Sequence, residues 1–144
     1  MFIRLSTENT IDYWEIIKFV ALKTIGVKVK SIEEYCRNIL IALLSNKYQC
    51  WFVLSEDRII QWVLITGIRH DFGGTISLFA HTLYGFSPIS IQEKEQVKYG
   101  LIEFAKCLKA QYILCAPSST LAEKVCEQTG MTQLAKIYVQ EVGD

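Results

Sequence analysis

Residues 74–131 read GTISLFAHTLYGFSPISIQEKEQVKYGLIEFAKCLKAQYILCAPSSTLAEKVCEQTGM, and strand and helix patterns alternate along them. The segment predicts a strand at Thr75–Tyr84, a proline turn, a long helix, a strand at 111–116 and a shorter helix that Gly130 ends. Two parallel strands joined by a helix place the N-terminus of that helix at the mouth of the sheet, where ligands tend to bind. The segment therefore predicts both the centre of the fold and the position of a site.

Two capping boxes mark the starts of these helices. They read Ser90-Ile-Gln-Glu93 and Thr120-Leu-Ala-Glu123. In such a box the hydroxyl and the carboxylate each satisfy a free backbone N–H of the first turn. We therefore expect the long helix to begin after Ser90 and the shorter one after Thr120.

The N-terminal part predicts a short strand at residues 2–6 followed by two helices. The first helix runs from Ile11 to about Ile25, with Asn9 or Thr10 as its cap and Gly26 as its stop. The second helix follows the capping box Ser31-Ile-Glu-Glu34 and ends near Ser45.

Three antiparallel strands are predicted next, and one further strand at the C-terminus. The runs Gln49–Leu54 and Ile59–Ile68 flank the polar turn SEDR and predict a hairpin, to which Thr75–Tyr84 adds a third strand. A last strand is predicted at Leu134–Val142. The order is β-α-α-β-β-β-α-β-α-β, an α/β (α+β mixed-sheet) fold in a single domain over residues 1–144.

Composition excludes several function classes. The chain has 15 basic and 15 acidic residues, which argues against a general nucleic-acid partner. Its longest apolar run, Ile39–Leu44, is too short to cross a membrane, and the N-terminus lacks the apolar core of a signal peptide. Five cysteines without CxxC spacing favour reduced thiols and a cytoplasmic protein.

The C-terminal third resembles the GCN5-related N-acetyltransferase (GNAT) superfamily. Members often end in N-x-x-A-x-x-L-Y-x-x-x-G-F before a strand, and this chain keeps the spacing with Ser119, Ala122, Val125, Cys126, Gly130 and Met131 at the named positions. The resemblance covers essentially the whole chain and implies a GNAT-like fold. In that fold the fourth and fifth strands splay apart, and the slot between them takes the pantetheine arm of acetyl-CoA.

The loop that grips the cofactor in the family departs from its usual pattern here. The pattern is Q/R-x-x-G-x-G/A, whereas residues 84–95 contain neither G-x-G nor arginine. Pro88 lacks an N–H donor, and Ser90 and Glu93 would occupy the free N–H groups of the helix. Glu93 and Glu95 place negative charge where the pyrophosphate would bind. The loop predicts an eroded acyl-CoA site, a feature that also resembles phage-type GNAT-like proteins.

The resemblance also supplies candidate site residues. Cys126 stands at the position of a tyrosine that protonates the departing thiolate, although a small buried helix residue is the plainer interpretation. His81 and Tyr84 are the other two candidates for proton transfer, and both lie on the fourth strand. Alternation along this strand predicts one face with Ile76, Leu78, Ala80 and Tyr84 and the other face with Ser77, Phe79 and His81. The candidate cofactor-binding residues are Leu83, Gly85, Ser87, Ser90 and Ser119. Phe86 is expected to plug the slot.

Other chemistries receive little support. His70, Asp71 and His81 are scattered without the spacing of a metal site, so no metal is expected. No cysteine lies in an evidently electropositive setting that would make it a nucleophile. Trp51 and Trp62 fit a sheet core better than a base-stacking platform, because no basic residues alternate with them.

Three hypotheses follow. The first is a GNAT-fold protein that has lost acetyl-CoA-dependent transfer, needs no cofactor, and serves as a binding or structural module for an unknown protein or small-molecule partner. The second is a working N-acyltransferase that uses acetyl-CoA through an atypical loop. The third is a self-associating scaffold, in which the C-terminal strand or the hairpin pairs across a two-fold axis of a homodimer.

Overall fold

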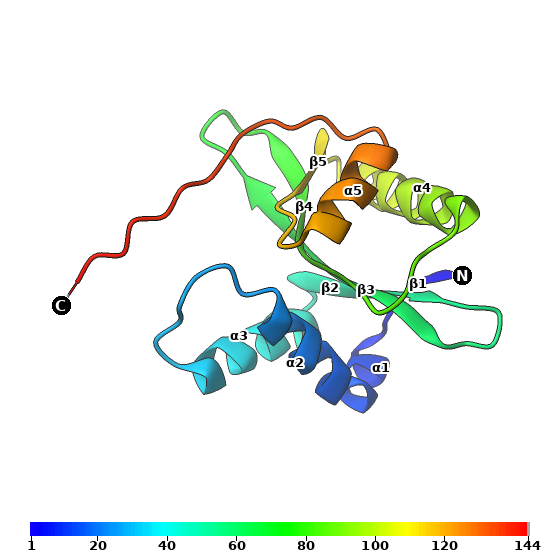
Figure 1. Cartoon of the computed structure of the whole chain (residues 1–144), viewed down its shortest axis with the longest axis horizontal. Helices are drawn as coiled ribbons and strands as arrows, with labels where there is room; N and C mark the ends of the chain where they lie inside the picture. Colours follow the sequence, from blue (N-terminus) through cyan, green and yellow to red (C-terminus); the bar gives the residue numbers. More distant parts are fainter. Residues whose placement is uncertain (144) are drawn as a thin grey trace.

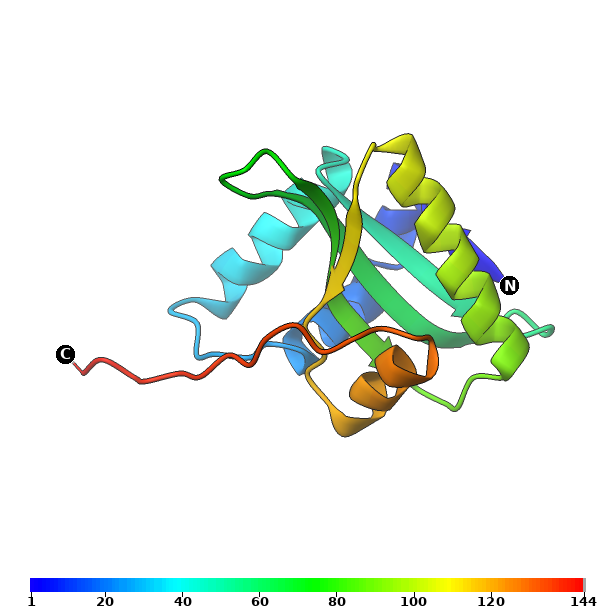
Figure 2. The same cartoon turned by 90° about the horizontal axis from the view of Figure 1, so that it is seen from above.

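A five-stranded sheet lies between two layers of helices in the computed structural model, which describes residues 1–143. Helices α1–α3 cover one face of the sheet, and α4 and α5 cover the other (Figures 1 and 2). The strands are β1 Phe2–Arg4, β2 Tyr48–Leu54, β3 Ile60–His70, β4 Ile76–Gly85 and β5 Tyr112–Cys115. The helices are α1 Thr7–Asp12, α2 Trp14–Lys23, α3 Ile32–Leu44, α4 Ile91–Cys107 and α5 Thr120–Gln128.

The strands follow the order β1-β2-β3-β4-β5. Strands β1 to β4 pair antiparallel with one another in this order, and β5 pairs parallel with β4. A parallel pair needs a crossover, which α4 supplies. The α/β fold class predicted from the sequence is confirmed.

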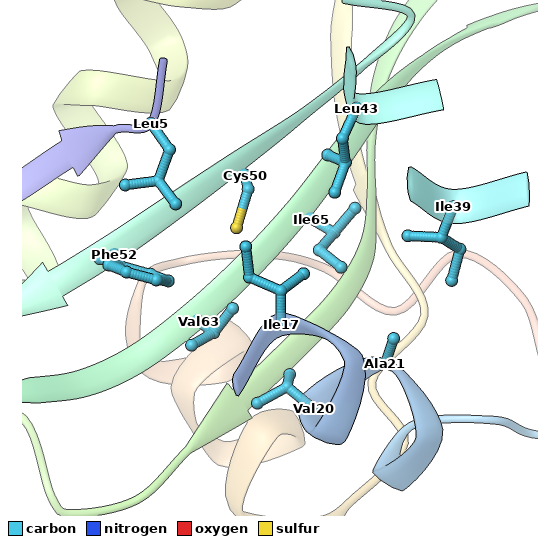
Figure 3. Packing of buried hydrophobic residues seen from close by; sticks show 10 residues of the cluster. All are labelled: Leu5, Ile17, Val20, Ala21, Ile39, Leu43, Cys50, Phe52, Val63 and Ile65. Atoms are coloured by element: carbon cyan, nitrogen blue, oxygen red, sulfur yellow. The ribbon is translucent and has the colours of Figure 1, made fainter. Parts of the chain in front are cut away.

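Two hydrophobic cores form on the two faces because side chains alternate along the central strands. In β2, Cys50 and Phe52 face α2 and α3, as Figure 3 shows, whereas Trp51 and Val53 face α4. Both cores contain fully buried residues, such as Ile17 in the first and Trp62 in the second. The strands are therefore buried on both faces, which explains their nearly continuous apolar sequences.

The first predicted helix is two helices. Ser6, rather than Asn9 or Thr10, caps α1, because its hydroxyl accepts a 3.1 Å hydrogen bond from the Asn9 N–H. The chain leaves helical geometry at Tyr13 (φ −103°, ψ 15°), and α2 starts at Trp14. Helix α2 ends at Lys23 with Thr24 as its C-cap, before the predicted stop at Gly26.

Two further predictions are wrong in detail. Ser119, not Thr120, caps α5, and its hydroxyl accepts a 3.1 Å hydrogen bond from the Ala122 N–H. The strand predicted at Leu134–Val142 does not form, and residues 132–143 have no regular structure. A strand is stabilised by its hydrogen-bonded partner, and no ladder bond joins this segment to the described part of the sheet.

Candidate functional site

Strands β4 and β5 separate at the middle of β4. Their ladder runs from the pair Ser77 and Tyr112 to the pair Ala80 and Cys115. Strand β4 continues to Gly85 without β5 beside it, so the two strands splay apart beyond this point (Figure 2). The splay expected of the fourth and fifth strands is confirmed.

A β-bulge lies where the strands begin to part. Thr66 pairs with Ala80 and the preceding Ile65 pairs with Thr82, so His81 is the extra residue of β4. A bulge redirects side chains and is over-represented beside active sites. Here it reverses the alternation of β4 for every residue that follows.

The bulge corrects the predicted position of Tyr84. Its ring lies 6.3 Å from the ring of Phe19 in α2, edge to face, on the side of the sheet that α1–α3 cover. Alternation without a bulge had placed Tyr84 with Leu78, which packs on the α4 side. Leu83, one residue earlier, is the one that faces α4 and α5.

His81 lies on the same side as Tyr84. Its Nδ1 is 3.1 Å from the hydroxyl of Thr82, which is itself 3.1 Å from the hydroxyl of Thr24 at the C-terminal end of α2. The ring is half-buried, with its centroid 6.0 Å from that of Tyr48. Burial lowers the pKa of His81 from its ordinary value of 6.5, because the charged ring would lose solvation.

Cys126 belongs to the opposite side of the sheet. It lies half-buried in α5, and its thiol is next to that of Cys115 at the end of β5. The pKa of Cys126 is lowered and that of Cys115 is raised, because the Cys115 S–H can donate to a Cys126 thiolate. His81 and Tyr84 are therefore together on one face, and the sheet separates them from Cys126.

The side chain of Trp62 packs on the α4 side of the sheet, at the end of β4. The residue is almost fully buried, and its ring covers Gly85, where an added Cβ would lie 2.2 Å from the indole Cε2. The indole N–H also donates a 2.7 Å hydrogen bond to the carbonyl of Ser87. A cavity of only about 20 Å³ remains beside it; its walls include Leu83, Ile89, Val97 and Val125.

Phe86 does not plug the slot as expected. Its ring stacks on Phe19 at a centroid distance of 6.3 Å and an interplanar angle of 18°, on the α2 side. Trp62, for which the sequence predicts only a place in the sheet core, lies over Gly85 instead. The signal in the sequence is the glycine at the end of β4. Trp62 of β3 pairs directly with Gly85, and a glycine opposite a tryptophan leaves room for the indole ring.

The N-terminus of α4 is capped by its own residues. The Glu93 N–H donates to the Ser90 hydroxyl at 3.1 Å, and the Glu93 carboxylate accepts from the Ser90 N–H at 2.9 Å, so the predicted capping box is present. The Lys94 amine donates to the side-chain oxygen of Gln128 and so ties the first turn of α4 to the end of α5. An anion at this helix end would meet the Glu93 carboxylate.

The five predicted cofactor-binding residues all have structural contacts. Leu83 packs in the α4-side core, and Gly85 lies under Trp62. The carbonyl of Ser87 accepts from Trp62, while Ser90 and Ser119 cap α4 and α5. Their side chains and backbone groups do not converge on an open cavity.

Solved structures identify the architecture. A predicted acetyltransferase from Clostridium acetobutylicum, in a structure with acetyl-CoA, matches with a TM-score of 0.68 and 14% identity over 98% of this chain and 95% of its own. A ribosomal-protein-alanine N-acetyltransferase from Brucella melitensis biovar Abortus 2308 matches with a TM-score of 0.67 and 11% identity over 99% of both chains. The fold is that of the GNAT acetyltransferases.

A third GNAT structure, an aminoglycoside N-acetyltransferase in complex with CoA, matches with a TM-score of 0.66 and 11% identity over 99% of this chain and 93% of its own. No protein-family model and no curated protein sequence matches the chain. At these identities the likeness to GNAT structures establishes the fold and leaves the chemistry to the residues of the site.

Residues 1–143 contain neither a metal-binding cluster nor a membrane-spanning helix. No three or more His, Cys, Asp or Glu side chains in this range lie close enough together to hold a metal ion. No helix in the same range is both long and apolar enough to span a membrane.

Proposed function

We propose that this GNAT-fold protein does not use acyl-CoA and serves as a binding or structural module. The observation that supports this most directly is the cavity of about 20 Å³ beside Trp62. Pockets for small molecules and cofactors measure about 300–1,000 Å³. A pantetheine arm that entered between β4 and β5 toward α4 would have to displace the Trp62 indole from Gly85 and Ser87.

The helix end supports the same proposal by its charge. Phosphate groups bind helix N-termini through free N–H groups and the positive end of the helix dipole. In α4 the capping box uses the Ser90 and Glu93 N–H groups and brings a carboxylate to this end. Lys94, the nearest cation in the first turn, is engaged with Gln128.

Calorimetry of the full chain with acetyl-CoA and with desulfo-CoA tests the proposal. We expect no heat of binding and no thermal shift up to millimolar cofactor. A ligand at about 100 times its dissociation constant would stabilise the protein by about 2.7 kcal/mol, which a thermal melt detects readily. Saturable micromolar binding of either compound would contradict the proposal, and a cooperative melt of the same sample shows that the protein tested is folded.

A second candidate function is N-acyl transfer from acetyl-CoA through an atypical loop. The bulge at His81 favours this function. It lies directly after Ala80, where the ladder between β4 and β5 ends and the β4 backbone no longer has β5 beside it. Release of free CoA thiol from acetyl-CoA in the presence of amine acceptors would support this function. Release that persists in Trp62→Phe and disappears in His81→Gln would assign it to the bulge.

A further inference from the structure

Two cysteines face each other between β5 and α5. Strand alternation gives Cys115 the same side of β5 as Ile113, which packs in the core under α4 and α5. The side chains of α5 that are not exposed recur at helical spacing and are Ala122, Val125 and Cys126. Val125 packs in the same core as Ile113, so this face of α5 lies on the sheet. The Cys126 thiol is accordingly next to that of Cys115.

The pair lies at the border of the core rather than at its centre. Both thiols are free and half-buried, whereas Cys36 and Cys50 are buried. Strand β5 ends at Cys115, and the residues that follow it, 116–121, are all exposed. Small solutes in the solvent can therefore reach the two sulfur atoms.

Cys126 is the thiol of the pair that ionises more readily. Its pKa is lowered, and that of Cys115 is raised, because the Cys115 S–H can donate to a Cys126 thiolate. The thiolate is the nucleophilic form of cysteine. Cysteines that respond to oxidants combine a low pKa and solvent access with a second thiol close by, which resolves the first product. Cys126 and Cys115 have the arrangement of such an attacking and resolving pair.

The charges around Cys126 favour a neutral oxidant. Glu123 and Glu127 precede and follow it in α5, and their negative charges act on its thiol. Cys126 also lies in the last turn of α5, at the negative end of the helix dipole. An anionic oxidant such as glutathione disulfide would be repelled. Hydrogen peroxide is neutral and small enough to reach a half-buried sulfur atom.

We propose that Cys126 and Cys115 form a redox site that hydrogen peroxide converts to a disulfide. The Cys126 thiolate attacks one peroxide oxygen, the O–O bond breaks, and the leaving hydroxide takes up a proton to become water, which leaves a sulfenic acid on Cys126. The Cys115 sulfur then attacks the Cys126 sulfur. The S–O bond breaks, and the hydroxide leaves as water with the Cys115 proton. Two thiols and one peroxide thus give one disulfide and two waters, with two electrons passing from sulfur to oxygen.

The disulfide would join α5 covalently to the end of β5. In the reduced protein α5 is held by the packing of Ala122 and Val125 and by the contact between Lys94 and Gln128. A cross-link across a short loop removes conformational freedom from the opened state of that segment. We expect amide hydrogen exchange in α5 to slow at least about tenfold when the disulfide forms. Equal exchange rates in the oxidised and reduced proteins would contradict this effect on α5.

Mass spectrometry of the unmodified full chain tests the site directly. The folded protein is treated with hydrogen peroxide, then unfolded and alkylated with iodoacetamide. We expect two fewer alkylated cysteines than in the untreated protein, a peptide in the non-reducing digest that joins Cys115 to Cys126, and reversal of both by dithiothreitol. Full alkylation of both cysteines overturns the proposal, and so does a cross-link between two chains. Conversion of Cys126 to sulfinic acid without a cross-link overturns it as well.

Three variants test the order of the steps. Cys115→Ala removes the resolving thiol, so the sulfenic acid on Cys126 should accumulate and be trapped by dimedone. Cys126→Ala should leave Cys115 reduced under the same treatment. Cys107→Ala, at the exposed end of α4, is the matched control and should form the disulfide as the unmodified chain does.

The order of attack is overturned by either of two results. One is Cys115→Ala without a dimedone adduct on Cys126, and the other is Cys126→Ala with an oxidised Cys115. The mass measurement on the unmodified chain does not depend on the folding of any variant. None of these outcomes depends on acyl-CoA, so they are independent of the proposed function.

Discussion

The indole N–H of Trp62 donates a 2.7 Å hydrogen bond to the carbonyl of Ser87. This bond joins β3 to the loop before α4, which in a GNAT fold leads to the helix end where the cofactor phosphates are expected. Because the same ring covers Gly85, one side chain both holds the loop and fills the space beneath it. This packing thus depends on a contact between residues 25 positions apart in the sequence.

Gly85→Ala tests this packing. The added Cβ would lie 2.2 Å from Cε2 and 2.3 Å from Cζ2 of the buried Trp62 ring, so the ring or the strand must move. We expect a loss of about 1–3 kcal/mol in the free energy of unfolding, typical of overpacking in a core. Urea denaturation measures it. Gly26→Ala is the control, since an added Cβ there meets no atom within 4 Å, and equal stability of the two variants would contradict the prediction.

Ser90→Ala tests the cap of α4. The substitution removes the hydroxyl that accepts from the Glu93 N–H, and loss of such a cap costs about 0.5–2 kcal/mol. The exposed Ser118 offers a control, Ser118→Ala, with an expected change within about 0.5 kcal/mol. Under the proposed function, Ser90→Ala still shows no CoA binding by calorimetry, because Trp62 remains in place. Binding gained by removal of the cap alone would show that the helix end, rather than the filled slot, excludes the cofactor.

His81 predicts a pH dependence of stability. Burial lowers its pKa in the folded state, whereas the unfolded chain binds the proton at about pH 6.5. As pH falls from about 6.5 toward the folded pKa, the unfolded state holds more protons and the free energy of unfolding decreases. His81→Gln should flatten this part of the profile, measured by urea denaturation at several pH values. His70→Gln, at the exposed end of β3, should keep the slope of the unmodified chain; equal slopes in all three proteins would count against a buried neutral His81.

The cysteines predict an order of alkylation. The hydrogen bond from Cys115 lowers the pKa of Cys126, so Cys126 should react before its partner, while burial raises the pKa of Cys50 to about 12 and keeps it unreactive. Peptide mass spectrometry after timed treatment with iodoacetamide measures each site. Cys115→Ala should slow the alkylation of Cys126 because the donor is lost. Cys36→Ala removes a buried thiol elsewhere and should leave the rate unchanged, and an unchanged rate in Cys115→Ala would exclude the thiol pair.

Local signals in the sequence predicted the elements well. The capping box at Ser90 and Glu93 marked the start of α4, and apolar alternation located the hairpin β2–β3. These signals act over a few residues, so the sequence contains them complete. Local signals do not decide between neighbouring cap candidates. Ser6 and Ser119 each lie close to other residues that are equally able to cap, so the predicted starts of α1 and α5 were misplaced.

By itself, the sequence determined the class of the fold, the order of its elements from α3 through α5, and the charge at the N-terminal end of α4, since all three depend on residue type and short spacing. Only the tertiary structure decided which residues meet. The extra residue at His81 turned Tyr84 to the α2 side, and the register of β3 against β4 placed Trp62, rather than Phe86, over Gly85. Register and burial arise from contacts between distant segments, and a one-residue shift moves each later side chain to the opposite face of the sheet.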